Sequence, residues 1–265
     1  MIHPTALVHK NARVADTAEI GPFAVIDEFV SIGEATSVGA HCTITGHTSI
    51  GKNNRIFSCA SLGSQPQDLK FKGETSYLEI GDNNIIRESC MFNPGTGEGG
   101  KTVIGSDNLF MACTHVAHDC IVGDHNIIAN GSVLAGHVVV ESHILISGLV
   151  AVHQFVHIGK MAIIGGCSKV VQDIPPFCTA DGHPARIYGL NLVGLRRNNV
   201  ARQTIKELGQ AFKIVFDSGL TPKRGLEKLA EAKPACEEVA YLVNFIKNSS
   251  RGVIRSCRAS VPSEE

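Results

Sequence analysis

Five of the seven histidines in the 43 residues from 115 to 157 could act together: His115, His118, His137, His153 and His157. A histidine ring gains or loses a proton near neutral pH, and it is also a common zinc ligand. The group therefore indicates either proton transfer by a general base or a metal centre. The remaining interpretation is a set of solvated histidines on a polar face.

The element that must hold these histidines is a repeat of six residues. From Ile2 to Val170, 26 aliphatic or phenylalanine residues occur in one register at every sixth position. A period of six fits neither a helix nor a simple alternating strand, so it predicts a short strand plus a turn, repeated. Such repeats resemble those of left-handed parallel β-helices, in which three hexapeptides form one coil. The handedness follows from this resemblance and not from the period.

Stacking of the coils predicts which histidines meet. Residues 18 positions apart would lie above one another on adjacent coils, about 4.8 Å apart. The short segments that carry His118, His137 and His153 then share one outer face of the β-helix. Three histidines that converge on one face favour a functional site over solvated side chains.

The repeat also predicts where the chain leaves the β-helix. It is interrupted at about 63–79 and at about 93–103, and we interpret both interruptions as loops that contribute to function. Residues 1–184 are expected to form the mainly β domain, a left-handed parallel β-helix. Apolar residues at helical spacing predict a small α-helical C-terminal domain over 185–265.

Charge and composition limit the classes of function. Residues 1–184 carry 10 Lys/Arg against 17 Asp/Glu, whereas 185–265 carry 14 against 8, so a net charge of −7 is followed by one of +6. The basic C-terminal region predicts an acidic partner. The sequence contains no signal peptide and no run of 18 apolar residues, so we expect a cytoplasmic protein without stable membrane insertion. We expect no nucleic-acid partner.

The segment His115-Val116-Ala117-His118-Asp119-Cys120 resembles a motif of the UDP-N-acetylglucosamine O-acyltransferases. An ordered set of matches along almost the whole chain makes this resemblance much more specific than the repeat alone. The matches are Gln67-Asp68-Leu69-Lys70, Ile85-Ile86-Arg87-Glu88, Gly105-Ser106-Asp107-Asn108-Leu109, Leu134-Ala135-Gly136-His137, Val152-His153-Gln154-Phe155, Asp173-Ile174-Pro175-Pro176, Gly189-Leu190-Asn191, Leu195-Arg196-Arg197 and Ser250-Arg251-Gly252.

The resemblance implies a reaction and catalytic residues. Members of the family transfer a 3-hydroxyacyl chain from acyl carrier protein to the 3-hydroxyl of UDP-N-acetylglucosamine, the first step of lipid A biosynthesis. His118 would be the general base, Asp119 would orient its ring, and the backbone N–H of Gly136 would stabilise the oxyanion. No cofactor and no metal ion are implied.

The resemblance also implies binding residues and an assembly. A homotrimer is expected, with the acidic carrier protein docking on the basic C-terminal region that contains Arg196, Arg197, Arg202, Lys206 and Lys213. In the second loop, Asn93-Pro94 replaces a His-Arg pair that is common in the family. The expected substrate-binding residues are Asp68, Lys70, His115, His137, His153, Gln154, Gly166, Asn191 and Arg197.

Three other functions compete with this interpretation. The related UDP-sugar N-acyltransferases carry a domain before the β-helix, whereas the repeat here begins at Ile2. A zinc enzyme resembling the γ-type carbonic anhydrases would use the same fold and histidine ligands. A non-catalytic hexapeptide scaffold is disfavoured by histidines that converge beside two loops.

Overall fold

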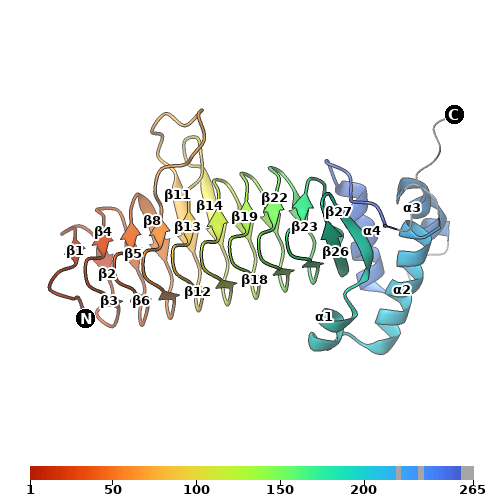
Figure 1. Cartoon of the computed structure of the whole chain (residues 1–265), viewed down its shortest axis with the longest axis horizontal. Coiled ribbons are helices and arrows are strands. Elements are labelled where there is room, and N and C mark those ends of the chain that lie inside the picture. Colours follow the sequence, from red (N-terminus) through yellow and green to blue (C-terminus); the bar gives the residue numbers. More distant parts are fainter. Residues whose placement is uncertain (219–221, 232–235, 258–265) are drawn as a thin grey trace.

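The computed structural model describes residues 1–218, 222–231 and 236–257. Short strands stack into one long row of coils that begins at the N-terminus, and helices cover the opposite end of the row (Figure 1). The strands form three parallel sheets, here called sheets A, B and C, one for each side of the coil. No helix in the described ranges combines the length and the apolar character that a membrane span requires.

Each sheet takes every third strand of the chain. Sheet B contains β1 (Leu7–Val8), β4 (Val25–Ile26), β7 (Thr43–Ile44), β10 (Ser61–Leu62), β13 (Met91–Phe92), β16 (His115–Val116), β19 (Val133–Leu134), β22 (Ala151–Val152) and β25 (Lys169–Val170). Sheet C contains β2 (Arg13–Val14), β5 (Ser31–Ile32), β8 (His47–Ile50), β11 (Tyr77–Ile80), β14 (Lys101–Ile104), β17 (Ile121–Val122), β20 (Val139–Val140) and β23 (His157–Ile158). Sheet A contains β3 (Glu19–Ile20), β6 (Ser37–Val38), β9 (Arg55–Ile56), β12 (Ile85–Ile86), β15 (Leu109–Phe110), β18 (Ile127–Ile128), β21 (Leu145–Ile146), β24 (Ile163–Ile164), β26 (Cys178–Gly182) and β27 (Ala185–Leu190).

The apolar register of the repeat forms the core. Every repeat residue from Ile20 onward is buried, because the last residue of each of these strands points inward and its coil has neighbours on both sides. Ile2, Val8 and Val14 are less buried, since the first coil has a neighbour on one side only. The predicted mainly β solenoid of hexapeptide repeats is therefore confirmed.

A buried asparagine ladder closes one corner of the coil. The side-chain oxygen of Asn54 accepts the backbone N–H of Asn84 at 2.9 Å, and Asn84 accepts that of Asn108 at 3.0 Å. Asn108 in turn accepts the backbone N–H of Asn126 at 2.8 Å. These bonds satisfy backbone groups that the sheets leave unpaired at the turn, so the corner can be buried.

Both predicted loops are present, and both are shorter than the sequence suggested. The first ends at β11, which begins at Tyr77, and the second ends at β14, which begins at Lys101. Residues 77–79 and 101–103 are therefore strand and not loop. The reason is that β11 pairs with both β8 and β14 over four residues, which extends sheet C beneath the two loops.

The C-terminal region is helical from Leu192 and not from residue 185. Residues 185–190 form β27, which pairs antiparallel with β26 at the end of sheet A. This pairing covers the last open edge of the sheet, which the repeat alone would leave exposed. The helices are α1 (Leu192–Arg197), α2 (Arg202–Phe216), α3 (Pro222–Glu231) and α4 (Glu237–Asn248).

Helix α4 is fixed to the β-helix by polar contacts. The hydroxyl of Tyr241 donates to the carboxylate of Glu141, and His157 Nε2 lies 2.9 Å from the same carboxylate. Just beyond α4, the hydroxyl of Ser249 donates to Asp173 at 2.6 Å. The contacts of Tyr241 and Ser249 join residues 100 and 76 positions apart and set the position of α4 relative to the last coils.

Candidate active site

His118 lies at the corner where the chain passes from β16 in sheet B to β17 in sheet C. The equivalent positions on the next two coils are Gly136 and Gln154, each 18 residues further along. All three line a pocket of about 360 Å³ on this corner. Its lining also includes Gln67 from the first loop and Asn93 from the start of the second.

His118 and Asp119 form a hydrogen-bonded pair. His118 is only 6% exposed, and its Nδ1 lies 2.8 Å from Asp119 Oδ2. A carboxylate only accepts hydrogen bonds, so Nδ1 carries the proton and Nε2 of the neutral ring keeps its lone pair. Nε2 lies 3.9 Å from Asp68 Oδ2 of the first loop. The pair therefore presents a basic nitrogen beside the pocket.

The Asp119 carboxylate is held in its charged form. It accepts the backbone N–H of Thr96 at 3.0 Å and 3.1 Å, and the Thr96 hydroxyl at 2.6 Å. Burial alone would raise the pKa of Asp119, but the hydrogen bonds from Thr96 and His118 outweigh it and the pKa is lowered. Asp119 is therefore an anion that can orient and stabilise a protonated imidazole.

Gly136 leaves space for the His118 ring. A Cβ at Gly136 would lie 2.5 Å from His118 Nε2, closer than atoms can approach. The backbone N–H of Gly136 has no hydrogen-bond partner within the described parts of the chain. This corner thus combines a ring nitrogen with a nearby free N–H donor.

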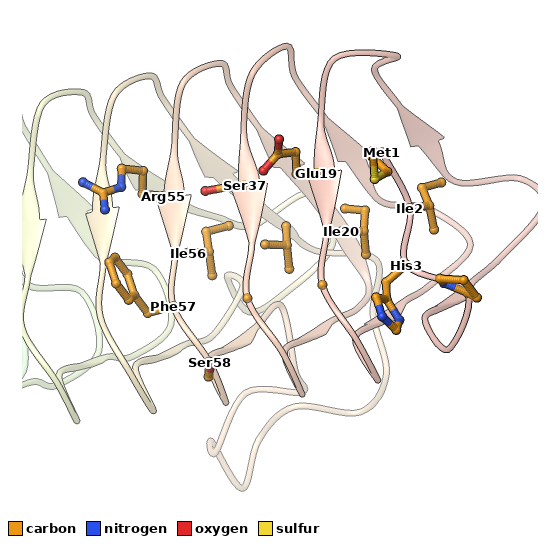
Figure 2. Close-up of a pocket in the computed structure, with 14 residues that line it drawn as sticks. Met1, Ile2, His3, Glu19, Ile20, Ser37, Arg55, Ile56, Phe57 and Ser58 are labelled. Atoms are coloured by element: carbon orange, nitrogen blue, oxygen red, sulfur yellow. The ribbon is translucent and has the colours of Figure 1, made fainter.

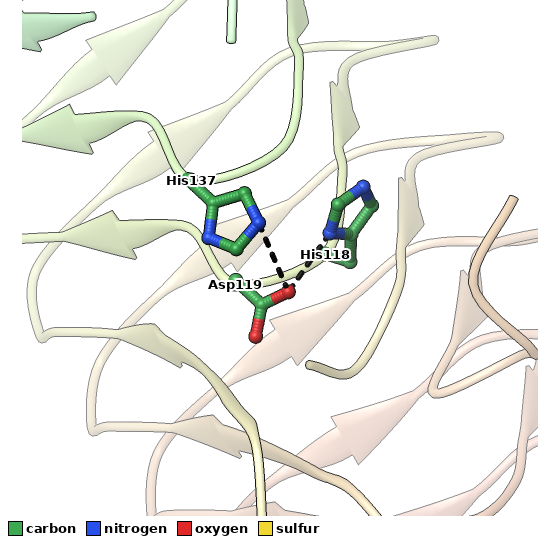
Figure 3. A group of neighbouring side chains, drawn as sticks. All are labelled: His118, Asp119 and His137. Carbon is green, nitrogen blue, oxygen red and sulfur yellow. Dashed lines mark hydrogen bonds and ion pairs between the residues drawn. The ribbon is translucent and has the colours of Figure 1, made fainter. Parts of the chain in front are cut away.

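His137 approaches the same Asp119 carboxylate as His118 does (Figure 3). Its ring meets His118 edge-to-face with centroids 5.2 Å apart, and its Nε2 lies 3.7 Å from Asp119 Oδ2. Phe155 stacks on the other side of His137, at 4.6 Å and 6°. Ligand atoms of His118, Asp119 and His137 lie within 4.8 Å of one another, so the three could hold a metal ion. Oδ2 of Asp119 is, however, already engaged by hydrogen bonds from His118 and Thr96.

Other predicted site residues lie around this cluster. His115 points outward from β16 into the pocket. Burial is the main cause that lowers its pKa, and His118 lowers it a little further, whereas the hydrogen bond to the Met91 carbonyl opposes the shift. Lys70 follows Asp68 in a tight turn, in which its backbone N–H donates to the Asp68 carboxylate at 2.9 Å. His153 lies on the same corner but is exposed and does not line the pocket.

Three predicted site residues lie away from the corner that carries His118. Asn191 caps helix α1, since its Oδ1 accepts the N–H of Gly194 at 2.8 Å and its Nδ2 donates to Met161 at 2.9 Å. Arg197 lies in the last turn of the same helix. Gly166 lies at a different corner of the coil, where the chain passes from β24 in sheet A to β25 in sheet B. The fold of one chain does not bring these three residues to His118.

Sequence reasoning assigned no structural role to two residues of the second loop. Thr96 was not distinguished from its neighbours, although its three hydrogen bonds hold Asp119. Asn93 is 1% exposed, and its side-chain amide donates to the carbonyls of Ser64 and Gln65 at 2.9 Å and 3.2 Å. The available signals were their position in an interruption of the repeat and, for Asn93, its departure from the His-Arg pair common in the family.

A second hollow lies at the N-terminal end of the β-helix, with a volume of about 460 Å³ (Figure 2). Its lining includes Glu19 and Arg55, which point outward from sheet A, and His3. The His3 ring is exposed and lies 3.0 Å from the hydroxyl of Thr5. This hollow lacks the buried histidine–carboxylate pair of the His118 pocket, which is therefore the candidate active site.

The parallel β-helix of hexapeptide repeats, with a histidine–aspartate pair at one corner, is typical of the hexapeptide-repeat transferases. Residues 101–136 match the family model of bacterial transferase hexapeptide repeats, and residues 173–254 match that of domain 2 of UDP-N-acetylglucosamine O-acyltransferase. A curated relative is the acyl-[acyl-carrier-protein]–UDP-N-acetylglucosamine O-acyltransferase of Aliarcobacter butzleri. It is 48% identical over 77% of this chain and 78% of its own length.

Solved structures agree with these matches. The UDP-N-acetylglucosamine O-acyltransferase of Moraxella catarrhalis is 43% identical with a TM-score of 0.92, over 96% of this chain and 99% of that one. The UDP-N-acetylglucosamine acyltransferase of Bacteroides fragilis is 41% identical with a TM-score of 0.93, over 96% and 100%. The chain belongs to the UDP-N-acetylglucosamine O-acyltransferase family, and the left-handed parallel β-helix with a small helical C-terminal region expected from the sequence is confirmed.

Proposed function

We propose that this chain transfers a 3-hydroxyacyl group from acyl carrier protein to the 3-hydroxyl of UDP-N-acetylglucosamine, the first step of lipid A biosynthesis. The observation that carries the proposal is the His118–Asp119 pair, 2.8 Å apart, whose free ring nitrogen lies beside the pocket. The relatives that share most of this chain bear the name of this reaction.

His118 acts as the general base. A sugar hydroxyl is a poor nucleophile until its proton is removed, and His118 Nε2 accepts that proton as the oxygen attacks the thioester carbonyl. The imidazolium that forms is stabilised by the Asp119 carboxylate on its other nitrogen. The same proton then passes to the departing thiolate of the carrier, so the enzyme returns to its starting state.

Gly136 supplies the oxyanion donor. Negative charge develops on the thioester oxygen in the tetrahedral intermediate, and a fixed N–H that is not engaged elsewhere can stabilise it. The unpartnered N–H of Gly136 in the described chain supports this role. The absence of a side chain lets the reacting atoms approach both this N–H and His118.

The remaining residues bind the substrates. Asp68, close to His118 Nε2, accepts a hydrogen bond from the sugar, and the ammonium of Lys70 binds a phosphate of the nucleotide. His115 and Gln154 contact the sugar or the acyl chain in the pocket that they line. His137 and His153 complete the binding surface along the same corner.

The working form is a homotrimer. Aliphatic side chains point outward from five adjacent strands of sheet A and form an apolar row that one chain leaves half-buried or exposed: Ile85, Leu109, Ile127, Leu145 and Ile163. Burying such a row against a second copy of the chain is favourable. In that assembly a neighbouring chain brings Asn191 and Arg197 to the nucleotide, and Gly166 leaves room for a long acyl chain.

The acidic carrier protein docks on the basic surface of α1 and α2. Arg196, Arg202 and Lys206 line one hollow between these helices, and helix α2 has no acidic residue in its first turn. Positive charges clustered on one surface attract an acidic partner, and salt reduces the distance over which this attraction acts.

The decisive test is acyl transfer from 3-hydroxyacyl carrier protein to UDP-N-acetylglucosamine by the wild type and by His118→Gln. We expect a loss of about 10²-fold or more in the variant. His125→Gln is the matched control, because His125 forms an exposed pair with Asp107 at 4.0 Å outside the pocket. Full activity in His118→Gln would refute the general-base role.

The alternative functions predict different results for the same purified protein. Faster transfer to an acceptor with a 3-amino group would identify an N-acyltransferase. Stoichiometric zinc together with carbon dioxide hydration would identify a zinc enzyme. The cytoplasmic location expected from the sequence stays a prediction, which cell fractionation tests.

A further inference from the structure

We propose that Thr96 is a positioning residue that acts on the base through Asp119. Its backbone N–H and hydroxyl fix the carboxylate, and the fixed carboxylate sets the tautomer and direction of the His118 ring. The catalytic part of this inference rests on the proposed function, whereas the effect on the ring can be measured without substrate.

Thr96 holds both carboxylate oxygens. The N–H spans them, at 3.0 Å from Oδ1 and 3.1 Å from Oδ2, and the hydroxyl donates to Oδ2 at 2.6 Å. Oδ2 is also the oxygen that accepts from His118 Nδ1 at 2.8 Å. A rotation of the carboxylate that broke the bond to His118 would also break those to Thr96, so each bond reinforces the other.

The second loop is shaped to bring Thr96 to this place. The loop leaves the β-helix at Asn93, and the N–H of Gly95 donates to the carbonyl of Tyr77 at 3.2 Å. A Cβ at Gly100 would overlap the carbonyl oxygen of Thr96, so the loop closes tightly enough only with glycine there. The N–H of Gly99 donates to the first loop at Thr75, at 2.8 Å, which braces the two loops together.

The charge of Asp119 depends on this contact. The carboxylate is mostly covered, and burial by itself favours the protonated form. The Thr96 hydroxyl is the largest of the interactions that favour the charged form, ahead of His118 itself. Removing the hydroxyl would thus weaken the anion that orients the ring.

The experiment compares Thr96→Val, Thr96→Ser and a matched control. Valine removes the hydroxyl and keeps the shape, and we expect kcat to fall on the order of tenfold with KM for both substrates unchanged. Serine keeps the hydroxyl and should restore most of the activity. Thr102→Val is the control, because Thr102 is buried in the strand after the same loop and its hydroxyl has no partner in the described chain. The control should retain wild-type kcat.

A double-mutant cycle separates this role from a general effect on the fold. If Thr96 acts through Asp119, adding Thr96→Val to Asp119→Asn should cost little beyond the single Asp119→Asn change. Fully additive losses, or wild-type kcat in Thr96→Val, would overturn the proposal.

A measurement made without substrate completes the test. ¹⁵N NMR of histidine-labelled protein, with His118 assigned by comparison with His118→Gln, reports which ring nitrogen carries the proton. We expect the Nδ1–H form in the wild type and a mixture of tautomers in Thr96→Val. An unchanged tautomer would overturn the proposal even if the wild type transferred no acyl group, whereas that inactivity alone would overturn only the proposed function.

Discussion

Gly136 lies against the imidazole of His118, so close that any Cβ at this position would collide with the ring, at 2.5 Å from Nε2. The two residues are 18 positions apart and occupy the same corner of adjacent coils. The His118 ring therefore fits this corner only because residue 136 has no side chain.

Gly136→Ala should inactivate the enzyme without unfolding it. The added methyl group displaces the His118 ring and obstructs the approach to the backbone N–H, so we expect kcat/KM to fall at least about tenfold. Gly148→Ala is the control, because a Cβ there would meet only the Asn130 carbonyl, at 3.4 Å. Acyl-transfer kinetics and the thermal unfolding midpoint check both variants, and wild-type kcat/KM in Gly136→Ala would contradict the assignment.

Glu141 should make stability depend on acid pH. Burial would raise its pKa, but hydrogen bonds from His157, Tyr241 and the backbone of Lys160 outweigh burial and lower it. A carboxyl whose pKa is lower in the folded state contributes stability that is present above its unfolded pKa, near 4.5, and is lost as pH falls through the folded value.

The measurement compares the free energy of unfolding of wild type and Glu141→Gln between pH 7 and pH 3. At pH 7 we expect the variant to be less stable by about 1–3 kcal/mol, and the difference should shrink at the acid end. Glu79→Gln removes an exposed ion pair with Lys101 and should change stability much less. A difference between wild type and Glu141→Gln that stayed constant with pH would rule out this linkage.

Ile127→Lys should disrupt the proposed trimer. Ile127 is 37% exposed in the middle of the apolar row on sheet A, and a buried unpaired ammonium there would oppose association. Light scattering after size exclusion should show smaller species, with acyl transfer lost in parallel. Leu7→Lys, on the first coil of sheet B and 68% exposed, should remain trimeric. A trimeric Ile127→Lys would place the interface elsewhere.

Arg202→Glu should weaken use of the carrier protein selectively. The substitution reverses a charge in the basic hollow of α1 and α2, so we expect KM for acyl carrier protein to rise about tenfold at low salt, with KM for UDP-N-acetylglucosamine nearly unchanged. The difference from wild type should narrow as salt increases. Lys247→Glu makes the same charge change at the end of α4 and serves as control. Equal effects of the two variants would argue against a defined docking surface.

Much of the fold was predictable because the buried residues of its core recur at a fixed interval in the sequence. Each buried anchor recurs after six residues, so the coils and the order of the sheets follow by counting. The strand β27 was not predictable in this way, since residues 185–190 lie outside the repeat and form a strand by pairing with β26. The ends of both loops were misjudged for a related reason, because pairing with neighbouring coils extends β11 and β14.

The sequence by itself determined the solenoid, the corner that carries His118 and the grouping of His118 with His137, because stacking brings residues 18 or 19 positions apart onto the same corner of adjacent coils. The tertiary structure alone decided that Thr96 donates hydrogen bonds to Asp119, that Asp68 lies near His118 Nε2 and that Asn191 caps a helix. Loops and caps follow no period. Their side chains are placed by hydrogen bonds between segments far apart in the sequence, and those partners become evident only when the coils are assembled.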